Sequence, residues 1–328
     1  MFSKVCFFDH AMEYQGGKKS MKFLNEMKEL IPFDAIEIIL IEKKIYKPNN
    51  GKAGRPSIPA KTLIGALFLQ NWYGLSDPMT EELINDRISF RKFLDIKDED
   101  TIPDETTICK FRNALIKEEL LESIFCEVRK VMENKKLILN EGTLIDATLV
   151  HCSEPKKKKD DQGNVISNEA YDKEATYTSK RGHKHHGHKM HIATDTNGII
   201  KDVVATTASS HDSTQFDKLT KNESKAIFAD SGYMSKERKR DLRSKGIFGG
   251  IVERRVRGQS KLREKQSRNN KRFAKIRSLV ELPFAFIKHH MNFKVARYLG
   301  IFKNQQHFYL LAACYNLRRV PNMIKVNG

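Results

Sequence analysis

Residues 188–209, "HKMHIATDTNGIIKDVVATTAS", decide the fold class. Two short runs of apolar and β-branched residues lie on either side of "TDTNG", whose residue types are typical of a turn. Comparable runs occur in "LILNEGTLIDATLV" (137–150) and in "SKAIFADSGYM" (224–234), where the strand is expected to end at Asp230. The pattern therefore predicts a series of short strands.

Helices are predicted between and after these strands, from about Ser213 to Leu219 and from about Ser235 to Lys245. "IFGGIV" (247–252) is a candidate for one more strand. This order of strands and helices predicts an α/β domain in which a mixed sheet is flanked by helices.

The first part of the chain is predicted to be helical, because apolar residues recur at helical spacing through residues 60–133. Asp77 followed by Pro78 predicts a helix N-cap with proline at the first helical position. "KPNNGKAGRPSIP" (47–59) is predicted to be a loop. Two interpretations of this half stay open: a helical bundle that only packs, or a helix-turn-helix-like module for DNA binding or dimerisation.

The composition indicates the kind of partner. Fifty-nine Lys and Arg against 41 Asp and Glu give a net charge of +18, which attracts a polyanion, with nucleic acid favoured over a membrane surface. The five cysteines form no CxxC pair, so neither a disulfide framework nor a zinc knuckle is indicated. Without an 18-residue apolar run or a signal-type start, the protein is expected to be soluble and cytoplasmic.

Two segments are expected to be irregular. Residues 152–187 are polar and charged, which predicts a loop excursion between the first two strands. Residues 251–278 contain eleven Lys or Arg against two Glu, a net charge of +9. This basic segment carries half of the chain's net charge, which predicts a surface that binds a polyanion.

Three acids stand out against this basic background. Asp146 lies inside an apolar run, where a carboxylate is costly to bury unless it is paired or bound to metal. Asp230 ends a predicted strand, and Glu281 lies in a basic helical stretch. In one continuous helix, Arg277, Glu281 and Lys288 would lie within about 40° of one another around the axis. Such a face is commonly a solvated ion-pair ladder, but the three acids together could hold two divalent ions about 3.5 to 4 Å apart.

The ordered motifs of the chain resemble those of bacterial insertion-sequence transposases of the DDE type, in the group built around insertion sequence five. The resemblance covers nearly the full length. It is carried by residues 55–96 and 101–115 of the helical part, by "LIDATLVHC" (144–152), "HGHKMHIATDTNGIIKDVVATTASSHDSTQF" (186–216) and "IFADSGYMS" (227–235), and by the Arg-x3-Glu-x6-Lys spacing in residues 277–319.

The resemblance implies an RNase H-like catalytic domain over residues 136–328, preceded by an all-α domain over 1–135 that binds DNA ends, dimerises or does both. It implies that Asp146, Asp230 and Glu281 are the catalytic triad. They would bind two Mg²⁺ or Mn²⁺ ions and catalyse strand cleavage and strand transfer at the terminal inverted repeats of the element.

The resemblance also implies that Arg277 and Lys288 contact DNA phosphates near the cleaved bond. Further phosphate contacts are expected from residues that share a positive charge and lie mostly in the basic segment: Lys189, Arg254, Arg255, Arg257, Lys261, Arg263, Lys271, Arg272 and Lys275. A homodimer or higher multimer on double-stranded DNA is expected. The chain departs from many related transposases at Ala274, where they have a tyrosine.

Helix geometry around Glu281 is complicated by Pro283, which removes a backbone donor and disfavours helical geometry at the residue before it. Either the helix kinks there or it begins close to Pro283.

Other candidate residues have plainer interpretations. "HKHHGHKMH" (183–191) holds five histidines, but their spacing matches no standard zinc pattern, and the role of this segment stays open. Trp72 is expected in the core rather than stacked on a base, and Asp195 is expected in a turn. Asp212 or Ser213 is expected to cap a helix, with a supporting role in the active site as the alternative.

Two rival functions remain at this point. A catalytically silent DNA-binding protein derived from a transposase would keep the fold. Loss of one acid is the simplest route to such a protein, so the presence of Asp146, Asp230 and Glu281 weighs against it. An RNase H-like nuclease would cut DNA without strand transfer. The helical half and the long basic segment favour a protein that holds two DNA ends.

Overall fold

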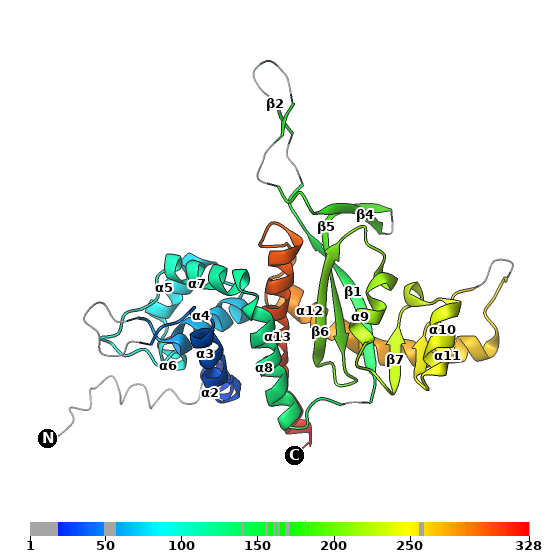
Figure 1. Cartoon of the computed structure of the whole chain (residues 1–328), viewed down its shortest axis with the longest axis horizontal. Helices are drawn as coiled ribbons and strands as arrows, with labels where there is room; N and C mark the ends of the chain where they lie inside the picture. Colours follow the sequence, from blue (N-terminus) through cyan, green and yellow to red (C-terminus); the bar gives the residue numbers. More distant parts are fainter. Residues whose placement is uncertain are drawn as a thin grey trace. The chain divides into compact units, whose positions relative to one another are not determined.

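The computed structural model describes residues 19–48, 57–139, 141–154, 157–159, 162, 165–167, 171–180, 182–255 and 259–327 (Figure 1). The chain divides into two compact units, one formed by Met132–Tyr315 and the other by Met1–Val131 together with Asn316–Gly328.

The helical unit contains α2 (Lys19–Leu30), α3 (Phe33–Glu42), α4 (Ala60–Tyr73), α5 (Asp77–Asp86), α6 (Ile88–Phe93), α7 (Glu105–Lys117) and most of α8 (Leu120–Asn134). Almost every residue of α4 is buried, which is typical of a helix surrounded by others. Trp72 near its end is 7% exposed, and its ring contacts those of Phe23, Phe68 and Phe93. The prediction that Trp72 lies in the core is confirmed.

Asp77 joins two helices of this unit instead of capping one. Its carboxylate accepts two hydrogen bonds from the guanidinium of Arg112 in α7, at 2.5 and 2.7 Å, and one from Gln70 Nε2 in α4. Ser76 caps α5 through its hydroxyl, one residue earlier than the sequence predicted. The capping prediction was wrong because long-range pairing with Arg112 engages the Asp77 side chain.

The other unit is built on a mixed sheet of β1 (Thr143–His151), β4 (Thr176–Lys180), β5 (His183–Thr194), β6 (Ile200–Thr207), β7 (Ala226–Ala229) and β8 (Phe248–Ile251). β5 pairs with β1 and β6 antiparallel, whereas β7 pairs parallel with both β1 and β8. The central order β6-β5-β1-β7-β8 is that of an RNase H-like fold, which confirms the predicted fold class.

Helices cover both faces of this sheet (Figure 1). On one face, the 3₁₀ turn η1 (Asp212–Gln215), α9 (Phe216–Thr220) and α10 (Lys236–Ser244) pack a core that contains Ile145, Ile227 and Ala229. On the other face lies α11 (Glu264–Arg277), whose Phe273 ring contacts those of Phe228 and Phe248. The helices predicted near 213–219 and 235–245 and the candidate strand at 247–252 are all present.

The polar excursion at 152–187 is less irregular than predicted. β2 (Lys157–Lys159) pairs with β3 (Val165–Ser167), and β4 pairs with the first half of β5, which already begins at His183. These strands contain few apolar residues and therefore lack the sequence pattern that predicts a strand. Backbone pairing with β5 gives β4 its extended form.

The chain breaks its helix before Glu281. α11 ends at Arg277, the 3₁₀ turn η3 (Ser278–Val280) follows, and α12 (Glu281–His289) begins with Pro283 in its first turn. Of the two predicted alternatives, the helix that begins close to Pro283 is correct. The expectation that Arg277, Glu281 and Lys288 share one face of a continuous helix was wrong, since a 3₁₀ turn separates Arg277 from the other two. α13 (Ile301–Asn327) then completes the chain.

Gly187 is required where β1 and β5 pair, opposite His151. It has a φ of +153°, and a Cβ there would lie 2.0 Å from the carbonyl oxygen of Val150. We expect Gly187→Ala to lower the free energy of unfolding by about 3 kcal/mol or more, measured by urea denaturation of the full chain.

Gly182→Ala is the matched control for this prediction. Its φ of +81° is also positive, but an added Cβ meets no heavy atom of the described residues within 4 Å. Only backbone strain of about 1 to 2 kcal/mol is then expected. Equal losses in the two variants would contradict the close approach of the two strands.

Candidate active site

Strand register brings Asp146 and Asp230 to the same place. In the parallel ladder Thr143 pairs with Ile227 and Leu144 with Phe228, so continuing it by two residues puts Asp146 opposite Asp230. Neighbouring strands lie about 4.8 Å apart, and residues paired across them point to the same face. This is the face that α11 covers, because Ile145 and Ala229 enter the core on the opposite side.

Arg277 and Glu281 approach this face from the helices. Arg277 Nη1 donates to Asp146 Oδ2 at 2.8 Å, and its Nη2 lies 3.8 Å from Glu281 Oε1. The side chains of Asp146 and Arg277 are 22% and 20% exposed, whereas that of Glu281 is 63% exposed. One guanidinium therefore bridges an acid on β1 and an acid at the start of α12.

The electrostatics of Asp146 reflect its neighbours. Burial raises its pKa above the ordinary aspartate range, and the nearby charges of Asp230 and Glu281 raise it further. Arg277 and the backbone N–H of Ala147 lower it, but only in part. Asp146 thus responds to the charges of both Asp230 and Glu281.

The donor set fits hard divalent cations. Asp146 lies near enough to Asp230 and Glu281 to respond to both charges, and Mg²⁺, Mn²⁺ and Ca²⁺ prefer such oxygen ligands. A cationic group, the guanidinium of Arg277, already lies between two of these acids. The carboxylates of Asp146, Asp230 and Glu281 therefore have the chemistry to hold divalent metal.

Lys288 and Lys189 both have protein partners. Lys288 Nζ donates to the carbonyl oxygen of Leu149 at 2.8 Å, and burial lowers its pKa. Lys189 Nζ donates to the Ser210 carbonyl and to Asp212 Oδ1, at 2.6 and 2.9 Å. Both lysines are half-buried, so each would have to exchange a protein partner for a phosphate.

Asp212 was considered for a supporting role in the active site as the alternative to a helix cap, whereas Tyr233 was not predicted as a site residue. Asp212 pairs with Lys189, while His211 caps η1 through its ring nitrogen, so the cap predicted at Asp212 or Ser213 was wrong. Tyr233 is buried near Asp212, Asp146 and Asp230, which with burial raise its pKa, and its hydroxyl has no hydrogen-bond partner among the described residues. A tyrosine after a predicted strand commonly belongs to the core, so only the structure shows that Tyr233 lies near these acids, in the 3₁₀ turn after β7.

The basic segment lies along α11 and the loop before it. Its predicted DNA-contacting residues share high exposure: Arg254, Arg255, Lys261, Arg263, Lys271, Arg272 and Lys275. Arg257 lies outside the described residues. Along α11, Arg268, Lys271, Arg272 and Lys275 recur at helical spacing and form one exposed face, the basic stripe, which contrasts with Phe273 against the sheet.

Two further predictions can be compared with the structure. Asp195 is buried in a turn and accepts hydrogen bonds from the backbone N–H groups of Leu139, Asn197 and Ile199, as turn chemistry predicted. Among the described residues, no helix is long and apolar enough to cross a membrane.

Without bound metal, the free energy of unfolding of the protein should depend on pH through the titration of Asp146. Because its pKa is raised, the folded state holds more protons than the unfolded state just above the ordinary aspartate range, and the free energy of unfolding falls as pH rises there. We expect Asp146→Asn to make this decline shallower in chelator-treated buffer, measured by urea denaturation at several pH values; the raised pKa of buried Asp195 maintains the remainder. Saturating Mg²⁺ should reverse it in the wild type, since cations displace the proton. An identical decline in the variant would contradict the assignment.

Comparisons with known proteins agree with this architecture. Residues 139–317, more than half of the chain, match the family model "Transposase DDE domain", and residues 13–114 match "Transposase domain (DUF772)". Among solved structures, the cryo-EM structure of a piggyBac transposase synaptic complex with hairpin DNA is similar at 10% identity and a TM-score of 0.47, over 93% of this chain and 76% of that one. The match to the DDE domain model covers nearly all of the unit formed by Met132–Tyr315. The chain belongs to the DDE transposase family, and it is an insertion-sequence transposase that cleaves and transfers phosphodiester bonds of DNA.

Proposed function

We propose that Asp146, Asp230 and Glu281 are the catalytic carboxylates of this transposase and hold its divalent metal. The observation that carries the proposal is the parallel register of β1 and β7, which aligns Asp146 with Asp230. Arg277 supports it, because its guanidinium reaches Asp146 and Glu281 together.

The metal is proposed to be a pair of Mg²⁺ or Mn²⁺ ions, for which three carboxylates are suitable ligands. When bound, such ions stabilise the attacking and leaving oxygens of a phosphodiester displacement. The protein's own part is to hold the acids in register and to keep Asp146 partly desolvated. Bound cations would offset the repulsion from Asp230 and Glu281, which adds to the effect of burial on the pKa of Asp146.

Arg277 is proposed to exchange partners when DNA and metal arrive. Its Nε is buried and has no hydrogen-bond partner among the described residues, so the guanidinium keeps a donor for a further acceptor. Once metal neutralises Asp146 and Glu281, a DNA phosphate becomes the better partner for this side chain. Lys288 and Lys189 are proposed to contact phosphates in the same way.

The basic stripe on α11 is proposed to bind the DNA backbone together with the exposed arginines and lysines that precede it. A hollow of about 850 Å³ between α10, β8 and α11 supports this, because basic side chains contribute to its lining. Lys239, Arg243, Arg263, Lys265 and Arg272 are among them. Contacts to phosphates give affinity without base preference, so specificity for the terminal inverted repeats is assigned to the N-terminal helical domain expected over residues 1–135.

Several finer features belong to the same proposal. The chain is proposed to belong to the group built around insertion sequence five, to pair two element ends as a homodimer or higher multimer, and to act at the nucleoid in the bacterial cytoplasm. The net charge of +18 supports a DNA partner.

The triad is tested by Asp146→Asn, Asp230→Asn and Glu281→Gln on a duplex that carries the element's own end, with Mg²⁺. Each variant is expected to bind DNA normally and to lose strand cleavage and joining by at least about 1,000-fold, because each removes a charged ligand. Asp195→Asn, which alters a buried acid in a turn on the same sheet, is the control for indirect effects.

Three outcomes distinguish the rival functions. Wild-type cleavage with joining supports the transposase mechanism, whereas cleavage without joining indicates a nuclease. A wild type that binds ends but cuts with neither Mg²⁺ nor Mn²⁺ indicates a DNA-binding protein. Normal cleavage by any of the triad variants would remove that acid from the proposed centre.

The basic stripe is tested by the triple variant Lys271→Gln, Arg272→Gln and Lys275→Gln. Each phosphate contact contributes about 0.9 to the slope of log affinity against log salt, so a slope shallower by about 2 to 3 is expected. Lys218→Gln, Lys221→Gln and Lys225→Gln remove three exposed lysines near α9, on the other face of the sheet, and form the control. An unchanged slope in the α11 variant would refute the phosphate contacts.

A further inference from the structure

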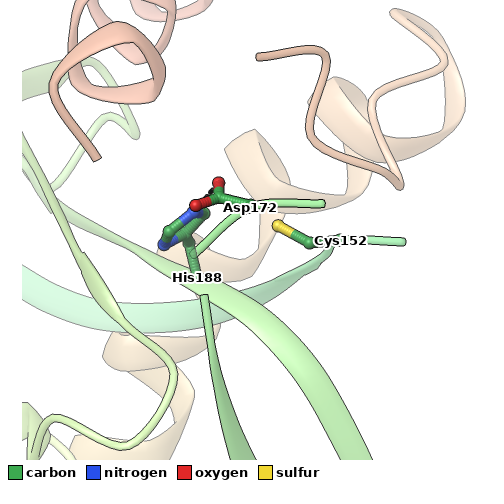
Figure 2. Close-up of side chains that lie close together, drawn as sticks. All are labelled: Cys152, Asp172 and His188. Atoms are coloured by element: carbon green, nitrogen blue, oxygen red, sulfur yellow. Dashed lines mark hydrogen bonds and ion pairs between the residues drawn. The ribbon is translucent and has the colours of Figure 1, made fainter. Parts of the chain in front are cut away.

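A second group of metal-ligating side chains gathers away from the three acids. Cys152 follows β1, His188 lies in β5, and Asp172 lies where the polar excursion returns to the sheet (Figure 2). Their ligand atoms, a sulfur, a ring nitrogen and a carboxylate oxygen, all lie within 4.8 Å of one another. This trio is far from Asp146, since Cys152 lies six residue steps after Asp146, about 20 Å along an extended chain.

The trio is built into the interior. The side chains of His188 and Asp172 are 0% and 2% exposed, and His188 Nε2 lies 2.7 Å from Asp172 Oδ2. Asp172 also accepts hydrogen bonds from the backbone N–H groups of Gly300 and Glu174, which hold the carboxylate in place. The other ring nitrogen of His188 is buried without a hydrogen-bond partner among the described residues. Cys152 is half-buried and leaves one side open.

We propose that Cys152, Asp172 and His188 bind one zinc ion at a structural site distinct from the catalytic centre. Thiolate, imidazole and carboxylate are all zinc ligands, whereas Mg²⁺ and Ca²⁺ prefer oxygen donors only. Zinc would take these three ligands and one water on the open side next to Cys152.

The present spacing is close to that of a zinc site. Tetrahedral zinc, with bonds of about 2.0 to 2.3 Å, separates its ligand atoms by about 3.3 to 3.7 Å. The trio has one separation of 2.7 Å and no separation above 4.8 Å. Side-chain rotations would therefore suffice, and the backbone of both strands could remain where it is.

Zinc at this place would join three segments that are distant in sequence. Asp172 and Glu174 already bond to the backbone at Gly300 and Ile301, where α13 begins. Cys152 directly follows β1, and His188 lies in β5, which pairs with β1. The ion would thus fasten both ends of the polar excursion and the start of α13 to the catalytic sheet, and its binding energy would add to the stability of this unit.

Two other roles for the trio explain less. A buried His188–Asp172 pair would stabilise the fold without metal, but it does not account for the thiol of Cys152, whose sulfur lies within 4.8 Å of the ligand atoms of both residues. A reactive thiol is disfavoured, because burial beside Asp172 raises the pKa of Cys152 to about 12.

The test uses the untagged full chain in the background Asp146→Asn with Asp230→Asn, so that the catalytic acids do not contribute. After loading with Zn²⁺ and passage over a chelating resin, we expect about one zinc per chain by mass spectrometry. Cys152→Ser and His188→Gln should each weaken zinc binding by at least about 100-fold. Zinc should raise the melting temperature of the background protein and leave that of Cys152→Ser unchanged.

Cobalt provides a spectroscopic readout that is independent of zinc retention and of thermal stability. Co²⁺ added to the background protein should give a sulfur-to-metal charge-transfer band in the near ultraviolet, which Cys152→Ser abolishes and Cys109→Ser, at a half-buried cysteine in α7, retains. Absence of this band, or failure of the protein to retain zinc, would overturn the proposal. So would equal zinc retention by Cys152→Ser, which would assign the metal to other histidines in residues 183–191.

Discussion

The parallel pairing of β1 with β7 aligns Asp146 with Asp230, and the other parts of the proposed catalytic site approach that point. Their neighbours Ile145 and Ala229 point the other way, into the core under α9 and α10. Side chains alternate along a strand, so a slip of one residue would bury both acids in apolar surroundings. Packing of the opposite face therefore keeps the carboxylates in register. Core stability and site geometry depend on the same strand pair.

Two partly desolvated acids so close together repel each other, and α11 supplies the opposite charge. Arg277 stands at its end and contacts Asp146, while the basic stripe lies on its exposed face. The 3₁₀ turn η3 then allows Glu281 to begin a new helix beside the same guanidinium. One helix thus brings a cation to the acids and presents positive charge to solvent, which is the arrangement that an enzyme acting on a polyanion needs.

Much of the catalytic unit could be predicted because its signals are local. Apolar runs between turn residues predict strands β1, β5, β6, β7 and β8. The spacing of apolar residues predicts the helices near 213–219 and 235–245. Predictions failed where a distant partner decides the conformation. Asp77 pairs with Arg112 rather than capping α5, and β4 is extended because β5 lies beside it. Neither partner is visible from the local sequence.

The sequence by itself determined the fold class, the family and three acids whose positions were unusual for so basic a chain. Only the tertiary structure decided that Arg277 bridges two of these acids and that Lys189 faces Asp212. It also brought Cys152, Asp172 and His188 together, although sixteen to twenty residues separate neighbours in this trio. The physical reason is that periodicity reports which face a residue takes on its own element. Proximity between elements depends on strand register and on the path of connecting segments, which only the packed chain fixes.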